Sequence, residues 1–168
     1  SGFADAQFRL GMCFAEGEGV SKDLQAAITW YTRAAKSGHA KSQFNLGTCY
    51  NEGIGVTINQ EEAVKWFARA AEAGLANAQL NLGNAYYHGH GTDKNLQEAV
   101  KWFTQAAEHG FVDAQNNLGV CYAQGTGVTK DLVRAYVWFD VASKTDADNI
   151  KNRDLCARMM TVEQISKA

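Results

Sequence analysis

The sequence contains no proline, no long apolar run and no marked excess of charge of either sign. Without proline, helix ends must be set by other residues, and the 16 glycines are the natural candidates. No apolar run approaches the roughly 18 residues that a membrane-spanning helix needs, so we expect no direct membrane insertion. The net charge of −2 comes from interspersed acidic and basic residues, which argues against a nucleic-acid partner because such proteins usually carry a basic stripe.

Tryptophan reveals an internal repeat. It occurs four times, always 36 residues apart, at Trp30, Trp66, Trp102 and Trp138. In that register a Leu-Gly pair, a following aromatic residue and a Gly-x-Gly motif recur in every unit without a gap. A fixed period of this length is the signature of a repeat architecture. We therefore expect four units over residues 1–145, at 2–37, 38–73, 74–109 and 110–145, followed by capping helices over 146–168.

Each unit is predicted to form two antiparallel helices. In the second unit Phe44, Leu46 and Tyr50 recur at the three- and four-residue spacing of one helical face. The Gly-x-Gly motif ends the first helix, because glycine enters left-handed backbone conformations cheaply. An N-cap for the second helix is present in every unit, at Asp23, Asn59, Asn95 and Asp131. Neither helix buries its apolar face until the next unit stacks on it, so the sequence predicts an all-α solenoid.

Two recurring features indicate close packing between helices. The glycine of each Leu-Gly pair, such as Gly83, costs about 1 kcal/mol in helix propensity, which is useful only where another helix comes close. Each tryptophan is followed by a second aromatic residue at helical spacing, as in Trp66-Phe67. We interpret these aromatic residues as inter-helix packing, with sugar or ligand stacking as the alternative.

The pattern Gly-x4-Gln-x2-Leu-Gly-x2-aromatic-x2-Gly-x-Gly, followed by Ala-x2-Trp-aromatic-x2-Ala-Ala, resembles the Sel-one-like repeat, a relative of the tetratricopeptide repeat. The resemblance covers residues 2–145. It implies a right-handed superhelix of tandem helix pairs whose first helices line a concave face. It also implies an adaptor role, in which the protein assembles other proteins.

In tetratricopeptide-like folds the non-recurring positions of the first helix face the groove. The resemblance therefore implies a partner-binding groove lined by Phe8, Arg9, Lys41, Phe44, Asn45, Thr48, Asn77, Leu80, Asn81, Asn84, Tyr87, His88 and Asn117. Asn45, Asn81 and Asn117 form a ladder of one carboxamide per unit, and a carboxamide can both donate to and accept from an extended peptide backbone. The alternative is that these asparagines are solvated or bond their neighbours. Arg9 and Lys41 are able to receive a carboxylate instead.

The cysteines give no sign of a disulfide or a metal site. Cys13, Cys49 and Cys121 share one place in the unit, and neighbouring first helices about 8–10 Å apart would lie beyond disulfide reach. We expect buried thiols, which slightly favour a reducing compartment. His88 and His90 flank a turn glycine and are weak candidates for a metal site. No cofactor is expected.

The two ends of the array differ. Ser1 matches the last residue of a unit, so we expect either that this chain is a fragment of a longer array or that Ser1-Gly2 is partly a cloning remnant. At the other end the register breaks after Ser143. A helix is predicted over Ala147–Met160, with Ile150, Leu155 and Met159 facing inward and its charged residues outward. Thr161-x-x-Gln164 then fits a capping box that opens a last short helix.

Together these features favour a protein–protein interaction scaffold, not an enzyme, that binds a partner protein or an extended peptide in its groove. Two alternatives remain open: an enzyme or a small-molecule- or glycan-binding module, and a structural spacer in a longer repeat protein. Against an enzyme, the sequence shows no recurring nucleophile–base pairing. The Gly-x-Gly motifs follow no strand, so they are not nucleotide-binding fingerprints.

Overall fold

The computed structural model describes residues 2–167, so Ser1, on which the expected array boundary depends, and Ala168, the end of the predicted cap, lie outside it. The described residues form α1 (Gly2–Glu16), α2 (Leu24–Lys36), α3 (Ala40–Glu52), α4 (Gln60–Glu72), α5 (Ala76–His88), α6 (Leu96–Glu108), α7 (Val112–Gln124), α8 (Leu132–Ser143), α9 (Asn149–Arg158) and α10 (Val162–Lys167). None of these helices is both long and apolar enough to cross a membrane.

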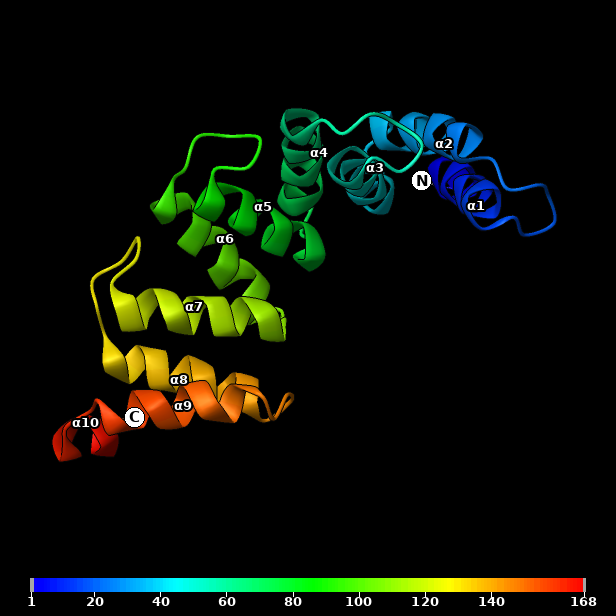
Figure 1. The fold of residues 1–168 in the computed structure, drawn as a ribbon. Coiled ribbons are helices and arrows are strands. Elements are labelled where there is room, and N and C mark those ends of the chain that lie inside the picture. Colours follow the sequence, from blue (N-terminus) through cyan, green and yellow to red (C-terminus); the bar gives the residue numbers. More distant parts are fainter. Residues whose placement is uncertain (1, 168) are drawn as a thin grey trace.

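The helices form tandem antiparallel pairs, which confirms the predicted fold class. Each odd-numbered helix from α1 to α7 packs on the even-numbered helix after it, and that helix packs in turn on the next odd-numbered one. In Figure 1 the pairs follow one another along a curved path, with α1 and α2 at one end and α9 and α10 at the other. The core is therefore a continuous series of contacts between neighbouring helices, as in a solenoid.

The predicted helix ends are confirmed by cap geometry. Asn59 Oδ1 accepts a hydrogen bond from the backbone N–H of Glu62 at 3.0 Å, and the three equivalent Asp and Asn residues cap their helices in the same way. Such a cap is worth about 1 kcal/mol. The first helix of the second unit ends at Gly53, which adopts the left-handed conformation with φ of 75°.

Glycine permits close packing inside each pair, as predicted. A Cβ added to Gly83 would lie 2.6 Å from the ring of Phe103 in the following helix, and the equivalent glycines meet Tyr31, Phe67 and Phe139 in the same way. A side chain at this position would push the aromatic ring out of its place. The ring fills the space that the missing side chain leaves.

The tryptophans pack between units, which confirms the packing interpretation. Trp66 is only 7% exposed and belongs to a cluster with Ile28 and Tyr31 of the preceding pair. Trp102 packs on Phe67 in the same way, one unit later. Trp30 is half-buried. The tryptophan of one unit thus closes the core of the unit before it.

The recurring glutamine joins consecutive units, a role that the sequence pattern did not identify. Gln43, Gln79 and Gln115 each donate a hydrogen bond from Nε2 to a backbone carbonyl in the last turn of the preceding helix, at 3.1–3.3 Å. These three glutamines are buried. The bond therefore ties the start of one helix pair to the end of the one before it.

The cysteines are free, as expected. Cys49, Cys121 and Cys156 are buried, and burial raises the pKa of each thiol, that of Cys121 to about 11. For Cys49 the charge of Glu52 adds to the rise in pKa. These thiols therefore behave as small apolar side chains.

The C-terminal helices form, but the predicted inward face of α9 is wrong. Ile150, Leu155 and Met159 are 38%, 58% and 50% exposed. The buried residues are Asn149 and Cys156, whose thiol donates to the carbonyl of Leu132 at 3.4 Å. Small side chains and hydrogen bonds set this face, because α9 must come close to α8. A sequence reading that weighs apolar residues alone selects the other side of the helix.

The last short helix begins as predicted. The backbone N–H of Thr161 donates to Gln164 Oε1 at 2.9 Å, and the N–H of Gln164 donates to Thr161 Oγ1 at 3.2 Å. This reciprocal pair is the expected capping box. The helix α10 that follows buries none of its residues.

Candidate ligand-binding groove

Four hollows along the odd-numbered helices are built from residues of consecutive pairs. We name each by the first and the last odd-numbered helix at its lining, and the N-cap residue Leu75 is counted with α5. The α1–α5 pocket has a volume of about 720 Å³, the α3–α5 pocket about 230 Å³, the α5–α7 pocket about 180 Å³ and the α7–α9 pocket about 660 Å³. All lie at junctions between units, so no single unit contains a complete site.

The α1–α5 pocket combines an apolar floor with two cations. Phe8 and Leu75 line it beside the exposed side chains of Arg9 and Lys41. The ring of His39 lies 4.8 Å from that of Phe8, and His39 Nε2 lies 3.1 Å from a carboxylate oxygen of Asp5. Asp5 is therefore already paired. Arg9 and Lys41 have no ion-pair partner among residues 2–167 and are free to meet an anionic group.

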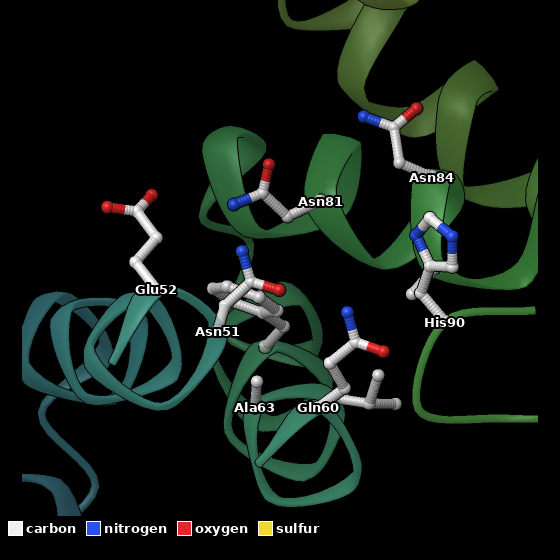
Figure 2. Close-up of a pocket in the computed structure, with 10 residues that line it drawn as sticks. Asn51, Glu52, Gln60, Ala63, Asn81, Asn84 and His90 are labelled. Carbon is white, nitrogen blue, oxygen red and sulfur yellow. The ribbon is translucent and has the colours of Figure 1, made fainter. Parts of the chain in front are cut away.

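The α3–α5 pocket is the most polar of the four. Figure 2 shows the carboxamides of Asn51, Gln60 and Asn81 and the imidazole of His90 around one hollow, with Glu52 at its edge. These side chains come from three helices and a turn: the end of α3, the start of α4, the middle of α5 and the Gly-x-Gly turn that follows. Beneath them lies the ring of Phe67, whose edge is buried against Gly47.

The polar groups of this pocket have almost no partners within the protein. Asn84 accepts a hydrogen bond from Asn117 Nδ2 at 3.3 Å. In the part of the chain that the structure describes, the side chains of Asn51, Gln60 and Asn81 form no hydrogen bond, and Glu52 forms no ion pair. Donors and acceptors that the protein leaves unused are available to water or to a ligand.

The α5–α7 and α7–α9 pockets repeat the same construction with different side chains. Moving 36 residues along the chain, Tyr87 and His88 replace Asn51 and Glu52 in the α5–α7 pocket. One unit further, Ala123 and Gln124 take these places in the α7–α9 pocket, beside Leu155 of α9. The side chains at these two places therefore change along the chain from polar and acidic, to aromatic, to small and uncharged.

The structure brings eight of the thirteen predicted groove residues into these pockets. The α1–α5 pocket contains Phe8, Arg9 and Lys41, and the α3–α5 pocket contains Asn81 and Asn84. The α5–α7 pocket contains Tyr87, His88, Asn117 and again Asn84. The other five are not among the lining residues. Phe44 and Leu80 pack on core clusters, and Asn77 is exposed. Thr48 Oγ1 donates back to the carbonyl of Phe44 at 3.2 Å.

The three asparagines of the predicted ladder are not equivalent. Burial raises the pKa of the Tyr31 phenol, and the neighbouring Asn45 carboxamide partly offsets that rise. Asn117 donates to Asn84. Within residues 2–167, Asn81 is the only one of the three that both lines a pocket and forms no side-chain hydrogen bond. The geometry therefore makes Asn81 the strongest of the three as a ligand contact.

Gln60 and His90 were missed because neither lies on a first helix. Gln60 begins α4, and His90 lies in the turn after α5. For Gln60 the sequence did contain a signal that could have identified it. The positions one unit before and after Gln60 hold Leu24 and Leu96. A polar residue that interrupts a column of leucines marks a place where the repeat has been altered.

The described residues hold no group of three or more His, Cys, Asp or Glu side chains that could bind a metal ion. His88 and His90 stack on each other instead, with ring centroids 5.3 Å apart.

A family model and solved structures of other proteins identify the same kind of repeat in this chain. A family model described as Sel1 repeat matches residues 4–39, 40–75, 76–111 and 112–144. The chain is 39% identical to c5321, a protective antigen present in uropathogenic Escherichia coli strains that displays an SLR fold. That match has a TM-score of 0.84 and covers 97% of this chain but 35% of c5321, so the chain spans about a third of that protein. No curated protein matches the sequence.

Two further solved structures extend this comparison. A Sel1 repeat protein from Oxalobacter formigenes is 34% identical, with a TM-score of 0.83, and the match covers 97% of this chain and 76% of that one. Cysteine-rich protein B from Helicobacter pylori is 23% identical with a TM-score of 0.61, over 77% of this chain and 94% of that one. The latter likeness concerns the fold alone.

Proposed function

This chain belongs to the Sel1 repeat family, and we propose that it is an interaction scaffold that binds a partner protein or an extended peptide segment along its odd-numbered helices. The bound segment passes the junction pockets in turn. Its backbone pairs with the free carboxamides, and its side chains enter the pockets. The protein holds its partner and performs no chemistry on it.

The α3–α5 pocket is the single observation that carries this proposal. Asn51, Gln60 and Asn81 stand around one hollow, and their side chains form no hydrogen bond with the protein among residues 2–167. A solvated carboxamide on a smooth helix surface needs no explanation, but three that converge over an apolar floor match a ligand with both donors and acceptors. A peptide backbone offers such groups at every residue.

The neighbouring pockets supply the contacts that a backbone alone does not give. Phe8 and Leu75 in the α1–α5 pocket and Phe103 in the α5–α7 pocket provide apolar surface on either side of the carboxamides. Apolar pockets for some side chains, with hydrogen bonds to the backbone between them, are a common way to bind an extended segment. A structural spacer has no need of such an arrangement.

The proposal is tested by replacing Asn51, Asn81 and Asn84, the asparagines that line the α3–α5 pocket, with alanine after a partner has been captured on the immobilised chain and identified. Each lost hydrogen bond is worth roughly 0.5–1.5 kcal/mol net. The triple variant should therefore bind the partner about ten- to a thousandfold more weakly, and Asn84→Ala should account for the smallest share because Asn84 already accepts a hydrogen bond from Asn117. Binding is measured by isothermal titration calorimetry, and folding by helicity and melting.

Lys65 and Lys101 provide the matched control. Both are exposed residues of even-numbered helices and pair with Glu62 and Glu98 in their own helix. Replacing both with alanine should leave the affinity for the partner nearly unchanged. The exposed ion pairs that are lost contribute little to the stability of the fold. If the triple asparagine variant binds as well as the wild type, the partner uses another surface and the proposal is wrong.

A further inference from the structure

The α3–α5, α5–α7 and α7–α9 pockets occupy equivalent places, so the differences between their side chains indicate what each one recognises. The residues at the rim are Asn51 and Glu52 in the α3–α5 pocket, Tyr87 and His88 one unit later, and Ala123 and Gln124 one unit after that. The phenylalanine floor is retained as Phe67, Phe103 and Phe139. The phenylalanine at the floor is therefore a feature of the repeat itself. The residues at the rim and walls differ between pockets, and we relate them to the choice of ligand.

Of these three pockets only the α3–α5 pocket carries a carboxylate. Glu52 is the last residue of α3, is exposed, and forms no ion pair within residues 2–167. Asn51, Gln60 and Asn81 add carbonyl oxygens that no donor in the described part of the chain uses. A carboxamide can turn to present either oxygen or nitrogen, but a carboxylate accepts only. The fixed negative charge of Glu52 therefore favours a positively charged group of the ligand.

We propose that the α3–α5 pocket accepts the guanidinium group of an arginine side chain of the bound segment. The inference rests on the function proposed above and assigns one specificity position within it. A guanidinium is always charged, carries five donors in one plane and accepts nothing, so it uses the acceptors that this pocket offers. Its flat face suits contact with an aromatic ring such as Phe67.

A lysine ammonium and a sugar fit the pocket less well. An ammonium is a compact point charge with three donors, whereas the acceptors here come from separate elements around the hollow (Figure 2). A sugar hydroxyl is neutral and both donates and accepts, so it gains less from the charge of Glu52 than a guanidinium does. Exchanging that charge for a neutral amide should therefore weaken arginine binding more than sugar binding.

The test titrates the whole ¹⁵N-labelled chain with Nα-acetyl-arginine-N-methylamide and follows backbone amide shifts by NMR. Saturable shifts are expected at Asn51, Asn81 and His90. The citrulline analogue, which has the same shape without the charge, should bind at least fivefold more weakly. Glu52→Gln should weaken arginine binding about three- to tenfold, a range kept modest because Glu52 is exposed. The variant ends α3 with an uncharged residue and is expected to fold as the wild type does.

Glu61→Gln is the matched control. Glu61 lies in the first turn of α4, next to Gln60, but does not line the pocket. This variant removes the same charge from the same region, so an unchanged arginine affinity supports direct contact with Glu52. Equal weakening by both variants would mean that only the general field of the protein attracts the cation, and the proposal would be overturned.

Three other results also contradict the proposal. They are citrulline binding as tightly as arginine, no shift at the pocket residues at tens of millimolar arginine derivative, and shifts there with N-acetylglucosamine but not with arginine. These outcomes concern the pocket alone. If they occur while the triple asparagine variant still loses its partner, the scaffold function stands and only the specificity assignment fails. If arginine binds as expected but the triple variant keeps its partner, the scaffold surface is wrong.

Discussion

The first repeat unit and the interior units share a sequence motif but differ in what lies against it. Gly19 and Gly91 occupy the same place in the Gly-x-Gly turn and adopt the same left-handed conformation, with φ of 71° and 69°. A Cβ at Gly19 would meet nothing within 4 Å, whereas one at Gly91 would collide with the backbone of Gln60 in the preceding pair. The same glycine therefore serves the turn in one unit, and both the turn and the stacking of units in another.

Two other recurring residues show the same difference. Trp66 is buried between units, but Trp30 is half-buried. Cys121 is 1% exposed, and Cys13 at the equivalent position is partly exposed. A repeated residue is thus present in every unit, but its energetic effect depends on the neighbouring unit. Pairs of variants at equivalent positions measure that contribution directly.

The largest difference is expected for tryptophan. Trp66→Ala removes a side chain from the core between units and should lower the free energy of unfolding by about 3–5 kcal/mol. Trp30→Ala should cost roughly half as much, because less of its surface leaves water on folding. Arg33 lies 4.6 Å from the ring centroid of Trp30, and Arg69 lies 4.6 Å from that of Trp66. Both variants therefore lose the same cation–π contact, and the comparison isolates the difference in burial. Urea unfolding followed by circular dichroism measures both, and equal losses would show that the tryptophans act within their own units.

The two turn glycines should give the next largest difference. An alanine in the left-handed conformation costs about 1–2 kcal/mol, and this cost applies to both Gly19→Ala and Gly91→Ala. At Gly91 the collision with the Gln60 backbone adds about 1–3 kcal/mol, because one pair must shift against the other. The unfolding midpoint of Gly91→Ala should therefore fall well below that of Gly19→Ala. Coincident unfolding curves would refute the idea that this glycine serves the stacking of units.

These comparisons also explain what the sequence could and could not predict. Helix bounds, caps and the close packing at Gly83 follow from short-range patterns, because the caps and the glycines of the Leu-Gly pairs act within their own unit. The α3–α5 pocket does not, since Gln60 and His90 come from different units and meet only after stacking. The buried face of α9 was mispredicted for a related reason. Hydrogen bonds and close approach to α8 determine it, and apolar periodicity carries neither.

Cysteine gives a smaller, pH-dependent difference. Burial raises the pKa of Cys121 from an ordinary 9.0 to about 11, so folding favours its protonated form. Its contribution to stability is complete below pH 9 and is lost between about pH 9 and 11, because the unfolded thiol ionises first. In urea unfolding at pH 8, 9 and 10, the wild type should lose more stability with rising pH than Cys121→Ala does. At pH 8 a thiol reagent should modify Cys13 before Cys121, and the reverse order would contradict the difference in burial.

The smallest effect is expected where the repeat itself departs from its pattern. Gln60 stands in a column that holds Leu24 and Leu96, which are half-buried, whereas Gln60 is exposed. Gln60→Leu restores the repeat, and burying part of one leucine side chain should raise the free energy of unfolding by about 0.5–1 kcal/mol. The reciprocal Leu96→Gln should lower it by a similar amount. If Gln60→Leu also weakens partner binding, the polar residue is present for the ligand at the expense of stability. A variant that is less stable than the wild type would instead show that Gln60 supports the turn at Gly91, and its place in the pocket would then be incidental.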